Sequence, residues 1–159
     1  MARKISSLIR KVIDPLEIAG VTRSVTPTEK RQIASDVADL IAGEILDHVA
    51  DLKSPVSGLG KFRALSKKYK AFKKSKGKGG DPNLRFSNKL LNALVSQPMK
   101  SGKVETGVTP KQQGKADGHN NFSGKSSLPE RRFIPDKKQN YNRVITAGIK
   151  EIVEDILGD

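Results

Sequence analysis

The stretch that decides the fold is TPTEKRQIASDVADLIAGEILDHVADL, residues 26–52. Its first residues have the order of a capping box: Thr26 as N-cap, Pro27 at the first helical position and Glu29 at the third. The apolar residues that follow recur at helical spacing and define one face: Ile33, Val37, Leu40, Ile41, Ile45, Val49 and Leu52. This pattern predicts a helix from about residue 27 to residue 51.

A second amphipathic pattern closes the chain. Asp136 followed by Gln139 indicates a weaker capping box, so we predict a terminal helix over residues 136–157. Its apolar stripe consists of Val144, Ile145, Ile149, Ile152, Val153, Ile156 and Leu157. Gly148 in the interior costs roughly 1 kcal/mol relative to alanine, which indicates close packing at that position.

The segments between these helices predict a small sheet. Residues 102–109 alternate in the manner of a strand, and residues 19–25 and 131–134 are its candidate partners. A short helix is predicted within residues 84–95, stopped by Pro98, and residues 110–127 are predicted to be an exposed loop. The fold class is therefore α+β, with two long helices packed on a small mixed or antiparallel sheet.

The N-terminal 25 residues are interpreted as an arm that precedes a single domain over residues 26–159. Apolar residues at helical spacing predict a short amphipathic helix over residues 3–13, ended by Asp14 and Pro15. Two interpretations of this helix stay open: a docking arm, or a first helix packed on the core.

Composition limits the function. The 159 residues carry a formal net charge of +13, which predicts affinity for a polyanion or for an acidic protein surface. Cysteine is absent, so disulfides and thiolate metal sites are excluded. No apolar run approaches the roughly 20 residues that span a bilayer, and no signal peptide is recognisable. We predict a soluble protein with no membrane contact, made in a reducing cytosol.

The positive charge concentrates in a basic loop region over residues 53–89, which we expect to be disordered until it meets a partner. Within it, residues 65–74 predict a short helix and residues 75–82 a loop. Two aromatic residues, Tyr69 and Phe72, lie among lysines that form the candidate polyanion or acidic-partner contact: Lys67, Lys68, Lys70, Lys73, Lys74, Lys76 and Lys78. These lysines either neutralise phosphates with salt-sensitive affinity, form a solvated face, or complement an acidic protein.

No pattern of catalytic, cofactor-binding or metal-binding residues stands out. Gly118 and Gly124-Lys125-Ser126 resemble a phosphate loop, but five residues separate the glycines where four are required, so a surface loop is predicted. His48 is interpreted as a boundary residue of the first long helix and His119 as part of a turn. We therefore expect no enzyme activity and no cofactor.

The order of several short motifs carries a resemblance that covers about residues 28–157. After the long helix come a Leu-Ser-x-x-Tyr segment at residues 65–73, a leucine-bearing segment at 84–90 and a strand at 104–108. A loop with His and Phe follows at residues 118–124, and a proline-bounded Arg-Arg-Phe segment at 129–135 precedes the terminal helix. This order resembles the phage virion-morphogenesis and tail-completion (neck) proteins, the group of the Mu G protein and relatives of the lambda minor tail protein Z.

The resemblance implies a structural virion protein of a tailed bacteriophage, assembled in the host cytoplasm. It implies a homo-oligomeric ring, six- or twelvefold, at the head–tail junction, in contact with other neck, connector and tail proteins, so that head and tail join. We place the subunit or partner interface on an extended, accessible segment formed by Arg131, Arg132, Phe133 and Ile134. The alternative is a basic nucleic-acid-binding protein that uses residues 53–89 for non-specific contact with DNA.

Overall fold

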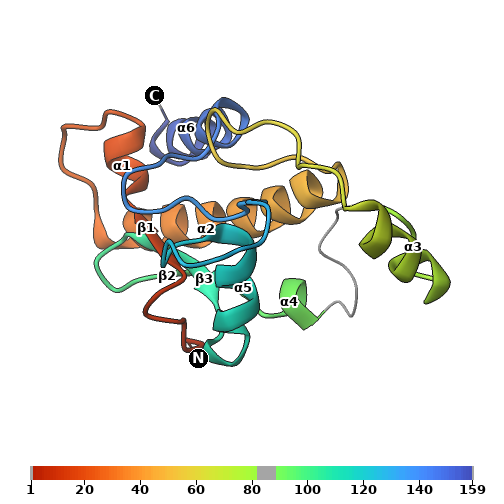
Figure 1. Ribbon diagram of the computed structural model, residues 1–159. Helices are drawn as coiled ribbons and strands as arrows, with labels where there is room; N and C mark the ends of the chain where they lie inside the picture. Colours follow the sequence, from red (N-terminus) through yellow and green to blue (C-terminus); the bar gives the residue numbers. More distant parts are fainter. Residues whose placement is uncertain (1, 82–88, 159) are drawn as a thin grey trace.

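The chain folds into stacked layers of a sheet and two long helices. The computed structural model describes residues 2–81 and 89–158. The sheet is antiparallel with strand order β1-β3-β2, and its strands are β1 (Arg10–Ile13), β2 (Leu94–Pro98) and β3 (Val104–Val108). Helix α2 (Pro27–Ala50) packs on β2 and β3 (Figure 1). The predicted α+β class, with a small antiparallel sheet, is confirmed.

The arrangement of the two long helices differs from the prediction that both pack on the sheet. Helix α6 (Arg143–Leu157) packs chiefly on α2 and on the short helix α1 (Pro15–Ile18). Close contact between the long helices occurs at Gly148, where an added β-carbon would lie 2.9 Å from Leu40 Cδ2. The close packing predicted at Gly148 is therefore confirmed, but its partner is α2.

Helix α2 begins as the sequence predicts. The Glu29 backbone N–H donates to Thr26 Oγ1 at 3.2 Å, and the Thr26 N–H donates to Glu29 Oε2 at 3.0 Å, so both bonds of the capping box are present. Its core-facing residues are Ile33, Ala34, Val37, Ala38, Ile41, Ile45 and Val49. Local sequence signals therefore suffice to place this element.

The predicted helix over residues 3–13 is wrong, and residues 2–25 do not form a separate arm. Arg10–Ile13 form β1, which pairs with β3 so that Arg10 lies opposite Gly107. Ile9, the residue before the strand, is fully buried in the core. The open edge of β3 supplies backbone partners, and the β-branched Val12 and Ile13 suit a strand, so tertiary pairing overrides the helical spacing.

The strand partners predicted for residues 102–109 are also wrong, although the strand itself is confirmed as β3. The second partner is β2, which takes up the end of the segment predicted as a helix over residues 84–95. Residues 84–88 of that segment lie outside the described residues, and α4 (Lys89–Asn92) is the helical part that follows. Pro98 ends a strand, because the turn back to β3 forms there, with Met99 N–H donating to Lys103 O at 2.8 Å.

The exposed loop predicted over residues 110–127 is wrong in its first half. A 3-10 helix, η1 (Pro110–Gln112), leads into α5 (Gln113–Asn120), which ends at Asn121 in the left-handed conformation. Ala116 and Asn120, four residues apart on one face of α5, are both fully buried. Burial of this face stabilises a helix of low apolar content.

The terminal helix begins later than predicted, at Arg143, with Asn142 as its N-cap. Asp136 and Gln139 do form the reciprocal hydrogen bonds of a capping box, at 3.2 and 3.0 Å, but these close a turn. The chain then stays extended because Tyr141 is buried and bridges Val56. Among residues 2–81 and 89–158, no helix combines the length and apolar character needed to cross a bilayer.

Candidate interaction site

Helix α3 (Lys67–Ser75) and the turn after it form a projection that we call the basic arm, residues 66–80. Ser66 caps the helix by accepting from the Tyr69 N–H at 3.2 Å. Figure 1 shows α3 at the edge of the molecule, away from the stacked layers. The predicted short helix is confirmed as α3, and the expectation that the basic region is disordered until it meets a partner stays a prediction.

The arm combines cations with exposed aromatic rings. Tyr69 and Phe72 are 43% and 47% exposed, their ring centroids lie 6.2 Å apart, and Lys76 Nζ lies 5.8 Å from the Phe72 centroid. The other exposed ammonium groups of the arm belong to Lys67, Lys68, Lys70, Lys74 and Lys78. Rings that can stack or pack, surrounded by positive charge, suit an anionic partner with an apolar or aromatic component.

Lys73 is the exception among the predicted contact lysines. Its side chain is only 2% exposed, and its Nζ donates to Asp81 O at 2.7 Å. Burial lowers the pKa of Lys73, and the Asp81 carboxylate partly offsets that effect. The prediction that Lys73 contacts a polyanion is therefore wrong, because this lysine lies inside the arm and stabilises its turn.

Arg131 holds the chain that leads into the arm. Its Nε donates to Arg63 O at 2.8 Å and its Nη2 donates to Ala64 O at 2.9 Å, while its backbone N–H donates to His119 O. The side chain is nearly buried, and this burial, together with the nearby charge of Arg63, lowers the pKa of Arg131. Arg131 thus links the chain just before the arm, through its guanidinium, to the end of α5, through its backbone N–H.

His119 lies beside this cationic junction. Its Nδ1 is buried and has no hydrogen-bond partner within the described part of the chain. Burial, followed by the charges of Arg131 and Lys73, lowers the pKa of His119 to about 4. The imidazole is therefore neutral near pH 7, and charging it would place a third cation at the junction.

We expect His119 to make the fold acid-sensitive. Its pKa is near 6.5 in the unfolded chain and about 4 in the folded one, so the unfolded chain takes up the proton first. The stability that depends on the neutral imidazole is complete above pH 6.5 and is lost as the pH falls towards 4. Urea unfolding at pH 7 and pH 4.5 should show a smaller loss for His119→Gln than for the natural chain. Equal losses would contradict this assignment.

The segment predicted as an accessible subunit interface is buried. Arg131 and Arg132 are 5% and 7% exposed, and Phe133 and Ile134 are fully buried. The reason is Asn120, whose Oδ1 accepts from the Phe133 N–H at 2.8 Å and from the Ile134 N–H at 3.0 Å, drawing the segment against α5. The expectation of an exposed extended segment is therefore not met.

The Arg132 side chain is likewise held by contacts within the chain. Its Nη1 donates to Asp136 Oδ2 at 2.9 Å and to Gln139 Oε1 at 2.7 Å, and its Nε lies 2.9 Å from Glu130 Oε1. The guanidinium also stacks over Phe122, 5.2 Å from the ring centroid. Reversing the charge of Arg131 or Arg132 would remove these internal hydrogen bonds and ion pairs, so it does not probe an interface.

The remaining sequence candidates have structural roles. His48 is satisfied at both ring nitrogens, by Glu44 O at 2.7 Å and by Asn142 Nδ2 at 2.8 Å, which confirms the boundary interpretation. Ser126 Oγ donates to Gly118 O, so the Gly-Lys-Ser sequence closes a turn on α5. Within residues 2–81 and 89–158, no group of three or more acidic or histidine side chains is placed to hold a metal ion.

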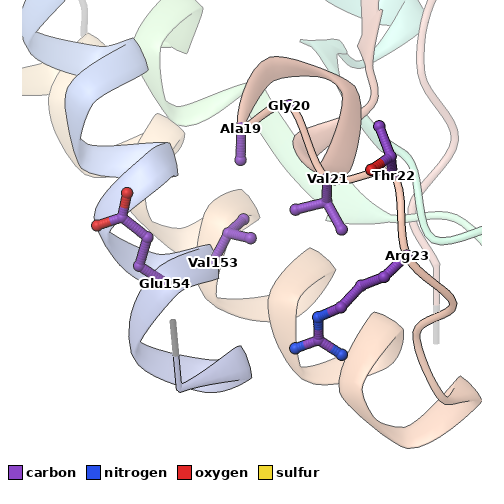
Figure 2. A pocket seen from close by; sticks show the side chains of 7 residues that line it. All are labelled: Ala19, Gly20, Val21, Thr22, Arg23, Val153 and Glu154. Carbon is purple, nitrogen blue, oxygen red and sulfur yellow. The ribbon is translucent and has the colours of Figure 1, made fainter.

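A second surface, which the sequence did not reveal, lies at the end of α6. It is a pocket of about 280 Å³ lined by Ala19, Gly20, Val21, Thr22, Arg23, Val153 and Glu154 (Figure 2). Arg23 Nη2 donates to Leu157 O at 3.1 Å, at the C-terminal end of the helix. Beside the pocket α6 exposes Glu151, Glu154 and Asp155, and we call these residues with the pocket the acidic end.

Comparison of the chain with models of known protein families, with curated proteins and with solved structures finds no match. The two surfaces described here present groups that bind: ammonium ions and rings on the basic arm, carboxylates and an apolar pocket at the acidic end. These groups are suited to contacts with macromolecules through charge and burial of apolar surface.

Proposed function

We propose that the chain is a structural virion protein of a tailed bacteriophage, which completes the tail or neck at the head–tail junction so that head and tail join. The observation that carries the proposal is the order of short motifs across residues 28–157, which resembles the virion-morphogenesis and tail-completion proteins. A small α+β body with a projecting binding arm suits an assembly subunit.

In this proposal the protein is not an enzyme, and it acts as a homo-oligomeric ring among neck, connector and tail proteins. Supporting it, the two histidines are engaged or enclosed within the chain: His48 by hydrogen bonds and His119 by burial at the base of the arm. The most accessible chemistry lies instead on the basic arm and at the acidic end.

Immunogold electron microscopy of purified particles tests the location. Antibody against the full chain should label the junction of head and tail in intact particles. Label confined to the capsid shell or the tail tip, or label on no particle at all, would contradict the proposal.

Nucleic-acid binding is the second candidate function. The specific observation that favours it is the set of six exposed lysines on the arm around the exposed rings of Tyr69 and Phe72, a combination that suits phosphate neutralisation and base stacking. Such binding would be non-specific, because lysine contacts to the backbone carry no sequence information.

This candidate predicts a steep salt dependence of duplex DNA affinity. A Lys67→Gln, Lys70→Gln, Lys74→Gln variant should reduce the slope of log K against log salt by roughly 2.7, since each phosphate contact contributes about 0.9. The matched control, Lys125→Gln, Lys137→Gln, Lys138→Gln, removes three exposed lysines elsewhere and should leave the slope nearly unchanged. Fluorescence anisotropy at several salt concentrations measures this, and equal slopes for both variants would contradict it.

A further inference from the structure

We propose that the basic arm of one copy of this chain docks on the acidic end of a second copy. The inference rests on the proposed function, because it identifies the two surfaces through which the subunits of an assembly would contact one another. Four features of the chain support it: the charges of the two surfaces, their placement on helix ends, the fit of a ring to the pocket, and the positions of the two surfaces in the fold.

The two surfaces have opposite charge. Every charged residue from Lys53 to Lys78 is basic. At the acidic end, the exposed side chains of Glu151, Glu154 and Asp155 occupy the last turns of α6 and outnumber the exposed Lys150 beside them. The cation in the pocket wall, Arg23, is already engaged with the Leu157 carbonyl oxygen. Opposite charge on facing patches favours association and fixes its orientation.

The N-terminal end of α3 and the C-terminal end of α6 each carry charges whose sign is unfavourable beside the dipole of that helix. Helix α3 has Lys67 and Lys68 in its first turn and no acidic residue there, at the positive end of the helix dipole. Helix α6 has Glu154 and Asp155 near its negative end and no basic residue in its last turn. Docking one end on the other places each set of charges beside its opposite, which offsets the repulsion at both.

An aromatic ring of the arm also matches the pocket. Tyr69 and Phe72 are exposed large apolar side chains, and solvent covers nearly half of each. Ala19, Val21 and Val153 give the pocket an apolar wall, and Figure 2 shows the two valines facing each other with Glu154 at the edge. Its volume of about 280 Å³ is ample for one ring, since a cavity of about 150 Å³ binds benzene.

The arm and the acidic end lie at opposite ends of the molecule. Figure 1 shows α3 on one side, and α1 with the C-terminal end of α6 on the other, beyond the length of α2. The arm therefore meets the acidic end of a different copy. A contact between two different patches is head-to-tail, and its repetition generates a ring if the rotation closes and a filament if it does not.

Charge reversal tests the contact directly on the full chain. The arm variant is Lys67→Glu, Lys68→Glu, Lys70→Glu, and the end variant is Glu151→Lys, Glu154→Lys, Asp155→Lys. In sedimentation velocity at low salt, the natural chain should form oligomers that dissociate as salt is raised. Each variant alone should stay monomeric at the same concentration. In the arm variant, reversing three of the six exposed lysines cancels the positive charge of the arm, and in the end variant both surfaces are positive.

Mixing the two variants should restore association, since the unaltered basic arm of the end variant then meets the unaltered acidic end of the arm variant. A charge-matched control, Lys125→Glu, Lys137→Glu, Lys138→Glu, should assemble as the natural chain does. Circular dichroism of each variant confirms that it is folded. A natural chain that stays monomeric, variants that assemble normally, or a mixture that stays monomeric would overturn the inference. Assembly of the natural chain only on addition of DNA would also overturn it, in favour of nucleic acid as the partner of the arm.

The outcome is distinguishable from failure of the proposed function. If particles lacking this protein join heads to tails normally while the mixed variants assemble, the function fails and the contact stands. If the junction fails without the protein but charge reversal has no effect on oligomers, the contact fails and the function stands.

Discussion

Replacing Asn120 by alanine is expected to lower the free energy of unfolding by about 4 kcal/mol, because it leaves buried polar groups without partners, each at a cost of about 1–3 kcal/mol. Asn120 Oδ1 accepts from the backbone N–H groups of Phe133 and Ile134, and its Nδ2 donates to Ala116 O at 2.8 Å. The side chain is fully buried, so water has no access to replace it. Urea unfolding followed by circular dichroism measures the change.

Asn140→Ala provides the matched control, because Asn140 is exposed and its backbone oxygen, which the substitution keeps, is the atom that accepts from Ser57 N–H. This variant should unfold within about 0.5 kcal/mol of the natural chain, as surface substitutions usually do. A change of less than about 1 kcal/mol for Asn120→Ala would show that this asparagine does not hold residues 131–134 against α5, since burial without a partner costs at least that much.

Gly107→Ala is expected to cost about 3 kcal/mol or more, at the upper end of what overpacking a core costs. A β-carbon at Gly107 would lie 2.2 Å from Ile9 O and 2.5 Å from Ile5 Cγ2, where strand β3 is crossed by the chain leading into β1. Ile9 O is a backbone atom and cannot move aside as the end of a flexible side chain can. Relief of the clash therefore requires displacement of β1. Thermal unfolding should show the loss, and limited proteolysis should cut earlier within residues 2–13.

Substitution of Gly43 by alanine is expected to have the opposite effect on stability. It lies inside α2, and an added β-carbon meets nothing within 4 Å. Gly43→Ala should therefore stabilise the chain by up to about 1 kcal/mol, the difference in helix propensity. If Gly107→Ala were as stable as the natural chain, the close pairing of residues 9–10 with β3 would be contradicted.

Sequence reasoning succeeded where the signal was local. The capping box and the apolar face of α2 lie within one segment, and the alternation of Val104, Thr106 and Val108 predicted β3. The strand partners depend on contacts across the chain, such as Arg10 with Gly107, and these leave no local pattern. The Asp136–Gln139 pair shows the limit well: its capping bonds form, but pairing of Tyr141 with Val56 keeps the chain extended until Asn142.

Only part of the candidate interaction site could be predicted from the sequence. The exposed lysines of the arm follow from composition alone, because a run of like charge stays at the surface. Burial of Lys73 and Arg131 does not, since their partners are carbonyl oxygens of Asp81, Arg63 and Ala64, which any residue could supply. The acidic end required the loop after α1 to be brought beside α6, a contact between segments about 130 residues apart in the sequence.

Electron microscopy of particles assembled with its gene disabled tests most directly the proposed role of this protein in joining heads to tails. The proposed function predicts filled heads and free tails that fail to join, with both structures otherwise complete. Normal infectious particles, or no virus at all, would contradict it and would leave salt-dependent binding of nucleic acid by the basic arm as the function to pursue.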